Sequence, residues 1–137
     1  MTRFRQSIEQ GYVKVIAIDR IKYKSLLKSS EEAVYSANKI PIETSTLKSI
    51  IRELYEGLRQ FCEAIGYLKG YKFLSHEAIT YFIEDILREQ RLSAKFDRYR
   101  KIRNGINYYG EDVSEETVKE ALREIPELIN QLGKHIK

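Results

Sequence analysis

The segment FDRYRKIRNGINYYG, residues 96–110, holds the side chains best suited to chemistry. A helical turn of about 100° per residue places four of its polar residues in one stripe: Arg100, Arg103, Asn104 and Asn107. A solvated helix face normally carries Lys and Glu, and asparagine is a poor helix former. Arginine next to asparagine amides offers planar donors that suit phosphate groups or base edges. The stripe therefore predicts contact with a phosphate-bearing ligand.

The dipeptide Asn104-Gly105 leaves two interpretations of this segment open. Asn-Gly is a strong hairpin-turn signal, but the flanking residues do not alternate as strands do. We favour a helix that continues through Gly105, where a glycine is a sign of close approach by another backbone. In that helix an apolar stripe beside the polar one is predicted to face the core: Phe96, Tyr99, Ile102, Ile106 and Tyr109.

Other chemistry-bearing residues are weaker candidates. His76 and His135 lie far apart, without a Cys/His/Asp cluster at metal-ligand spacing, so we expect neither a metal nor a cofactor. His76 follows Ser75 at a predicted helix start, and we interpret it as a surface residue of the first turn. Cys62 lies on the apolar face of a predicted helix and is interpreted as a small buried hydrophobe. No glycine-rich dinucleotide or P-loop motif is present.

Composition limits the class of protein. The 137 residues, 42% hydrophobic and 32% charged, are typical of one folded domain. No apolar run approaches the ~20 residues of a membrane span, and the charged start does not resemble a signal peptide, so a cytoplasmic protein with no membrane partner is expected. The net charge is +4, and residues 86–109 alone carry seven basic against two acidic residues. The positive charge is therefore concentrated where the polar stripe lies.

Periodicity and helix-end signals place these residues on helices. Asp19, Ser75, Ser93 and Ser114 are candidate N-caps, and Gly110 is a candidate left-handed C-cap. We predict an extended segment without a strand partner over 12–18, a connector over 66–73, a possible kink at Pro126, and helices over about 2–10, 19–38, 44–64, 75–87, 93–109 and 114–132. The expected fold is all-α: an antiparallel bundle over residues 19–137, with the short helix and extended segment of residues 1–18 packed on it.

Several short motifs resemble those of HEPN domains over roughly residues 19–132. They are Tyr55-Glu56-Gly57-Leu58-Arg59 leading to Ala64, then Gly70-Tyr71-Lys72, Ser75-His76-Glu77 and Arg103-Asn104. The resemblance implies an up-and-down four-helix bundle with one or two short extra helices. It also implies a homodimer that binds RNA or nucleotide in a basic cleft at its interface. Many family members resemble toxin ribonucleases paired with a minimal nucleotidyltransferase, so that partner is implied as well.

The family motif is an arginine followed, after four to six residues, by a histidine. Arg103 and Asn104 match it, while Tyr108 stands at the histidine position and Gly110 at that of a following tyrosine, next to Tyr109. Tyrosine, with an ordinary pKa of about 10, is a poor base at neutral pH. The resemblance thus implies a degenerate catalytic set of Arg103, Asn104 and Tyr108. The RNA- or nucleotide-binding set it implies is Arg100, Arg103, Asn107 and Tyr109.

Three functions follow from these observations. The polar stripe and the resemblance favour an RNA- or nucleotide-binding homodimer with little or no ribonuclease activity. The first alternative is an active, metal-independent endoribonuclease of the toxin–antitoxin type. The second is a helical dimerisation or adaptor protein in which the stripe makes only interface hydrogen bonds.

Overall fold

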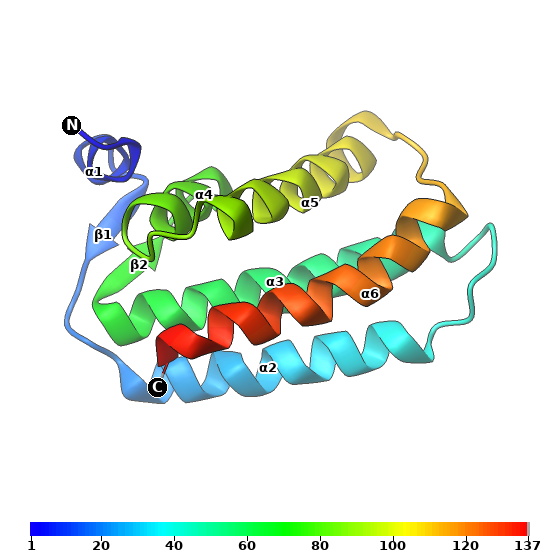
Figure 1. Ribbon diagram of the computed structural model, residues 1–137, viewed down its shortest axis with the longest axis horizontal. Coiled ribbons are helices and arrows are strands. Elements are labelled where there is room, and N and C mark those ends of the chain that lie inside the picture. Colours follow the sequence, from blue (N-terminus) through cyan, green and yellow to red (C-terminus); the bar gives the residue numbers. More distant parts are fainter. Residues whose placement is uncertain (137) are drawn as a thin grey trace.

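The computed structural model describes residues 1–136, most of which lie in helices (Figure 1). The four long helices are α2 (Arg20–Lys39), α3 (Leu47–Lys69), α5 (Gln90–Tyr109) and α6 (Glu115–Leu132). The shorter elements are α1 (Arg3–Glu9), β1 (Val13–Val15), β2 (Tyr71–Phe73), α4 (His76–Asp85) and the 3₁₀ helix η1 (Gly133–Ile136). This confirms the predicted all-α bundle with short extra helices. No helix within residues 1–136 is both long and apolar enough to cross a membrane.

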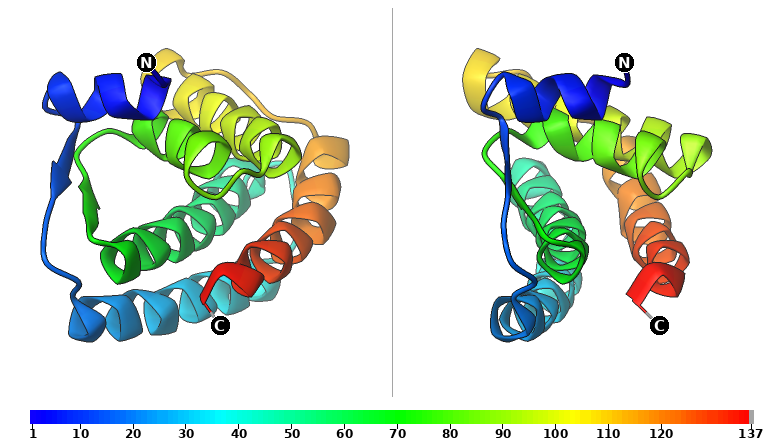
Figure 2. Two further views of the ribbon diagram at one scale, coloured as in Figure 1. Left: turned by 60° about the vertical axis from the view of Figure 1, so that its left-hand side comes forward. Right: turned by 90° about the vertical axis from the view of Figure 1, so that its left-hand side faces the viewer.

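Helix α3 lies at the centre of the bundle and contacts every other long helix. In the right-hand view of Figure 2, α2 and α3 lie on one side and α6 on the other, with α1, α4 and α5 forming a layer above them. The apolar stripe of α3 is buried along its whole length and meets apolar side chains from α4, α5 and α6. The core therefore runs along α3, and any residue on this helix that turns outward is held rigidly.

The close contact between α2 and α3 depends on Gly57. A Cβ at this position would lie 2.8 Å from Cγ2 of Val34 and 3.1 Å from the carbonyl oxygen of Ser30. The Ser30 hydroxyl also donates a 2.6 Å hydrogen bond to the Gly57 carbonyl oxygen. A larger residue at position 57 would therefore force the two helices apart.

The extended N-terminal segment has a strand partner, contrary to the sequence prediction. β1 and β2 pair antiparallel, with Val13 opposite Phe73 and Val15 opposite Tyr71. The partner comes from residues 66–73, which we had expected to form only a connector. Residues 66–69 of that region belong to α3, and Gly70, which has a φ of 89°, ends this helix. Pairing between segments so far apart in the chain leaves no local signal in either of them.

The first 18 residues share the core of the bundle. Phe4 of α1 is 2% exposed, and its ring centroid lies 5.0 Å from that of Tyr71 and 5.5 Å from that of Phe82. The Phe4 backbone N–H also donates to the Asp85 carboxylate at the end of α4. Residues 1–18 thus hold β2 and α4 together.

Three of the predicted helix ends are confirmed. Asp19 accepts a hydrogen bond from the Lys22 N–H, Ser114 accepts one from the Thr117 N–H, and Gly110 ends α5 with a φ of 64°.

The prediction that Ser93 caps a helix is wrong. α5 begins earlier, at Gln90, and the buried Ser93 hydroxyl donates to the Thr80 carbonyl oxygen, so it joins α4 to α5 instead. Ser75 precedes α4 as expected, although its side chain caps no backbone N–H, and α6 continues through Pro126. Cys62 is buried as expected, and burial raises the pKa of its thiol.

Candidate functional site

Helix α5 continues through Asn104-Gly105, so the helical interpretation of this segment is confirmed. The close neighbour of Gly105, however, is not another backbone. A Cβ there would collide with the side chain of Glu111, whose own N–H donates to the Gly105 carbonyl oxygen over 3.0 Å. Gly105 therefore leaves room for the loop that turns back after α5.

Arg103, Asn104 and Tyr108 lie together, as their spacing on one helix predicts. The Arg103 guanidinium carbon lies 5.7 Å from the centre of the Tyr108 ring and 5.5 Å from the centre of the Tyr55 ring on α3. Nη1 of Arg103 donates to the side-chain oxygen of Asn104 over 3.2 Å. Two aromatic rings and one amide thus fix the position of this guanidinium.

Within the described part of the chain, no carboxylate lies within ion-pair distance of Arg103. The other basic residues between positions 95 and 109 all have acidic partners: Lys95 with Glu124, Arg98 with Glu120 and Glu124, Arg100 with Asp97 and Glu77, and Lys101 with Asp97. Most of the positive charge that the sequence concentrates on α5 is therefore neutralised locally. Arg103 keeps its charge available for a ligand.

The remaining predicted binding residues are placed less favourably. The Arg100 side chain is only 12% exposed and forms ion pairs with Asp97 and Glu77. The side-chain oxygen of Asn107 accepts a 2.7 Å hydrogen bond from Nε of Arg52, which ties α5 to α3.

Tyr109 was predicted to face the core, and this is wrong, because its side chain is 78% exposed. The last turn of α5 extends beyond the buried part of the bundle, where the helical period no longer decides burial.

His76 belongs to the site, although sequence reasoning treated it as a surface residue. Its Nδ1 lies 3.1 Å from the Tyr55 hydroxyl, and the two ring centroids are 5.7 Å apart. Burial and the positive charges of Arg59, Arg103 and Arg100 lower the pKa of His76 to about 4, against a smaller opposing effect of Glu56. The imidazole is therefore uncharged at neutral pH in the free protein.

Tyr55 connects Arg103 to His76. Its ring contacts the guanidinium, its hydroxyl contacts the imidazole, and its side chain is buried in the core. Burial raises the pKa of Tyr55, although the charge of Arg103 acts in the opposite direction, so the hydroxyl keeps its proton. One helical turn further along α3, Arg59 is paired with Glu56 and Glu63.

Tyr55, Arg59 and His76 were not among the predicted site residues. The only signal for them in the sequence was that their two segments, 55–59 and 75–77, carry part of the HEPN resemblance. We refer below to Arg103, Tyr55 and His76 as the Arg103 cluster.

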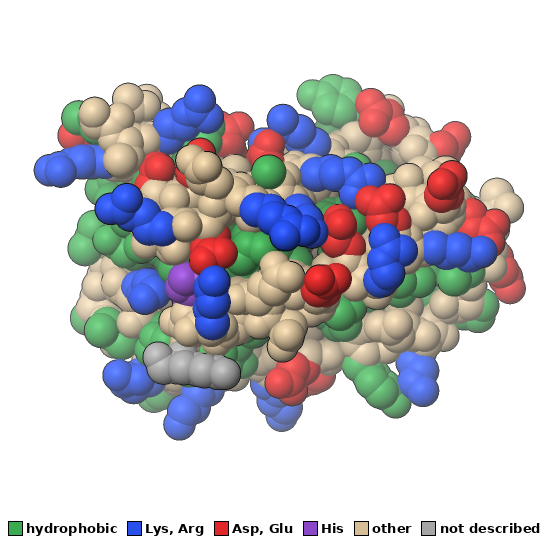
Figure 3. All heavy atoms as spheres, viewed as in Figure 1, with side chains coloured by type: hydrophobic (Ala, Val, Ile, Leu, Met, Phe, Trp, Pro, Cys, Tyr) green, Lys and Arg blue, Asp and Glu red, His purple; other side chains and the backbone are tan. Residues whose placement is uncertain are grey.

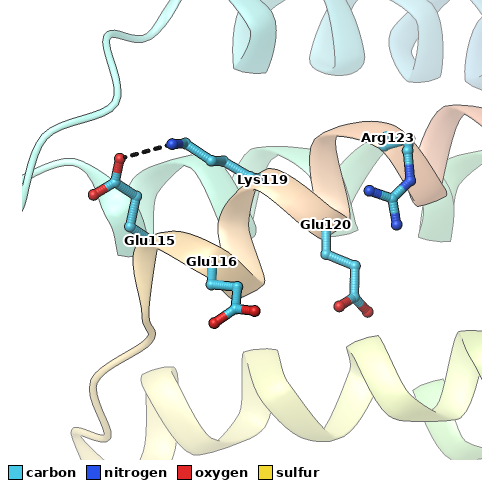
Figure 4. A pocket seen from close by; sticks show the side chains of 5 residues that line it. All are labelled: Glu115, Glu116, Lys119, Glu120 and Arg123. Atoms are coloured by element: carbon cyan, nitrogen blue, oxygen red, sulfur yellow. Dashed lines mark ion pairs between the residues drawn. The ribbon is translucent and has the colours of Figure 1, made fainter.

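Elsewhere the surface carries charges of both signs. Figure 3 shows Lys and Arg side chains interspersed with Asp and Glu over the face that includes α5 and α6. A shallow hollow on α6 is lined by residues of mixed charge, as Figure 4 shows: Glu115, Glu116, Lys119, Glu120 and Arg123. Lys119 pairs there with Glu115 over 3.2 Å. Opposite charges so close together do not favour an anionic ligand.

The fold and the Arg103 cluster define a helical-bundle protein with an arginine that lies against two tyrosine rings and has no carboxylate partner within residues 1–136. Residues 1–136 contain no group of three His, Cys, Asp or Glu side chains placed to hold a metal ion. No protein-family model matches the chain, and no curated protein matches it significantly.

Proposed function

We propose that this protein binds RNA or nucleotides through their phosphate groups, at Arg103. The observation that carries the proposal is a guanidinium held on two tyrosine rings without a carboxylate partner in the described chain. A guanidinium presents parallel N–H donors that match phosphate oxygens. Because the tyrosine rings already order this side chain, less freedom is lost when a ligand binds.

Tyr108 favours single-stranded RNA as the ligand. Its ring is 68% exposed beside Arg103, so one face is open to an unpaired base. Stacking of a base on an aromatic side chain contributes ~1–3 kcal/mol in proteins that bind single strands. A phosphate contact next to a stacking surface is the combination such proteins use, and the resemblance to HEPN domains supports the same ligand class.

The test compares two arginines of the same helix by fluorescence anisotropy with a labelled single-stranded RNA. We expect Arg103→Ala to weaken binding at least ~10-fold and to lower the salt slope by about one unit. Arg98→Ala is the matched control, because Arg98 is already paired with Glu120 and Glu124 and its loss should leave affinity nearly unchanged. Equal effects of the two substitutions would contradict the proposal. Competition with AMP and ATP separates a nucleotide site from an RNA site.

We also propose that two copies of the chain meet through α5. Tyr109 is large and 78% exposed at the end of this helix, and a second copy would cover it. Light scattering should then give about twice the chain mass of 16.1 kDa. A monomer at high concentration would refute the dimer and leave the Arg103 cluster to act alone. The nucleotidyltransferase partner is implied by the resemblance only.

His76 favours a second candidate function, that of a metal-independent endoribonuclease. The helical motif has Tyr108 where a proton-transfer group is expected, but His76 brings an imidazole into the Arg103 cluster from another helix. Turnover of labelled RNA in the presence of EDTA, lost in both Arg103→Ala and His76→Gln, would establish this activity. Binding without turnover would leave the first proposal. A dimer with neither property would be an adaptor.

A further inference from the structure

We propose that His76 is itself a ligand of the bound phosphate and that it takes up a proton as the anion binds. This inference rests on the function proposed above, and it concerns a residue outside the helix that carries Arg103. It makes phosphate binding by this protein dependent on pH in a range where phosphodiesters do not titrate.

The geometry leaves one imidazole nitrogen free for a ligand. Nδ1 of His76 is engaged with the Tyr55 hydroxyl. Nε2 makes no hydrogen bond within residues 1–136. It is not fully buried, so a ligand can approach it from solvent. The Tyr55 ring contacts the Arg103 guanidinium as well. An imidazole from α4, a phenol from α3 and a guanidinium from α5 are therefore neighbours, and Nε2 of His76 and the guanidinium of Arg103 are the groups open to a ligand.

The surroundings of His76 are positively charged while the site is empty. α3 contributes Arg59 and Glu56, and α5 contributes Arg103 and Arg100, so three cations face one carboxylate. Glu77, next to His76 on α4, pairs with Arg100. α1 also packs on α4, but its contacts are with Tyr81, Phe82 and Asp85, further along that helix. Together with burial, these charges oppose protonation of the His76 imidazole in the free protein.

An anion at Arg103 reverses this balance, because its negative charge offsets the arginines and favours the imidazolium. A protonated imidazole has a donor on each nitrogen. Its Nε2–H can then donate to a phosphate oxygen and its Nδ1–H to the Tyr55 oxygen. In this arrangement the Tyr55 hydroxyl is the acceptor, a role that its oxygen can fill at the same 3.1 Å separation. It keeps its own proton, since burial raises its pKa. The proton that His76 gains comes from solvent, and no covalent bond to the ligand forms.

Proton uptake on binding makes affinity rise as pH falls, by at most ~10-fold per pH unit for one proton. Carboxyl groups ordinarily titrate near pH 4 and tyrosines near pH 10, so histidines dominate between pH 5.5 and 7.5. His135 is the only other histidine in the chain, and its contacts are with Glu89. It therefore supplies a matched control outside the site.

The experiment uses a single-stranded RNA without terminal phosphates, at constant ionic strength and at pH 5.5, 6.5 and 7.5. We expect the affinity of the parent protein and of His135→Gln to increase at least ~5-fold from pH 7.5 to 5.5, and that of His76→Gln to stay flat. An equal pH dependence in His76→Gln, or none in the parent, overturns the inference while Arg103-dependent binding leaves the proposed function intact. If the parent binds neither this RNA nor AMP at any pH, the proposed function itself is refuted.

An NMR titration of the His76 ring tests the same point without a substitution. In the RNA complex the ring should titrate at least about two pH units higher than in the free protein, the shift that a ~5-fold gain in affinity requires, and an unchanged titration would overturn the inference. AMP used as a competitor in the same series shows whether a nucleotide phosphate occupies the position of an RNA phosphodiester.

Discussion

Helix α5 carries two arginines, Arg98 and Arg103, that lie against tyrosine rings but differ in their other partners. The Arg98 guanidinium lies 5.2 Å from the Tyr99 ring centre, and the Arg103 guanidinium lies 5.5 Å from that of Tyr55. Arg98 also donates to Glu120, and the Tyr99 hydroxyl donates to Glu124, both over 2.6 Å. We call this set the Arg98 cluster.

The difference lies in the acceptors and not in the donors. The two carboxylates of α6 compensate the Arg98 cluster, so its interactions are used within the fold to hold α5 against α6. In the Arg103 cluster the tyrosine contacts an uncharged imidazole, and the arginine has no carboxylate among the described residues. The same residue types thus have different roles. The Arg98 cluster joins two helices, and the Arg103 cluster keeps its arginine available to a ligand.

A carboxylate placed next to Arg103 should neutralise its charge, and we expect this change to have the largest effect on RNA binding. In Asn104→Asp the acceptor beside Nη1 of Arg103 gains a charge, so RNA affinity should fall about 30-fold at low salt, or about 2 kcal/mol. Asn107→Asp is the control, because the added charge lies one turn away and faces Arg52. Anisotropy titrations measure both variants. Equal losses would mean that only the net charge of α5 matters.

The free energy of unfolding of the protein should depend on pH through His76 of the Arg103 cluster. An unfolded histidine has a pKa near 6.5, whereas in the folded chain the pKa of His76 is lowered to about 4. The unfolded state therefore binds more protons between these values, and the free energy of unfolding falls as pH drops from about 6.5 to 4. After allowance for solvent screening we expect a loss of about 1–2 kcal/mol.

Urea denaturation of the parent and of His76→Gln across this pH range measures the effect. His135→Gln shows how much of the fall belongs to the other histidine, whose pKa is also lowered, by burial. Identical pH dependences in the parent and in His76→Gln would show that the imidazole of the site is solvated.

The contribution of the Arg98 cluster to the free energy of unfolding should be lost at a lower pH than that of His76. Burial acts to raise the pKa of Glu124, but the hydrogen bond from Tyr99 and the charges of Lys95 and Arg98 outweigh it and leave the pKa below its usual value. Because the folded pKa is depressed, the stabilisation is present above the usual glutamate pKa and is lost as pH falls through the folded value.

Replacement of Glu124 should have the smallest effect of the three. We expect Glu124→Gln to lower the free energy of unfolding at pH 7 by about 1 kcal/mol without weakening RNA binding. Glu127→Gln is the control on the same helix, since within residues 1–136 Glu127 forms no ion pair and accepts one hydrogen bond, from Gln131, and its effect should stay below about 0.5 kcal/mol. Equal stability of both variants would mean that the Arg98 cluster does not hold α5 to α6.

What could be predicted from the sequence depended on local signals. The helices follow from apolar periodicity, and Asp19, Ser114 and Gly110 mark helix ends because capping involves only residues within a turn. The β1–β2 pairing and the hydrogen bond from Ser93 to Thr80 depend on how distant segments pack, so neither was predicted.

The same distinction holds for the site. Arg103, Asn104 and Tyr108 lie within six residues of one helix, and their proximity was predictable from the helical period. His76 meets Tyr55 across 21 residues, and the apolar periodicity of α4 does not indicate which helix its inward face packs against. Whether an arginine finds a carboxylate also depends on neighbouring helices, so the sequence could not separate Arg98 from Arg103.

The buried thiol of Cys62 gives the molecule an internal reporter of its own opening. It is the only cysteine in the chain, it is 1% exposed within the core along α3, and burial raises the pKa of its thiol. A thiol reagent can therefore react only when the helices around α3 separate. The ratio of its reaction rate to that of a free thiol measures how often the bundle opens. For the same reason, a cysteine introduced on the surface can be labelled selectively while Cys62 stays in place.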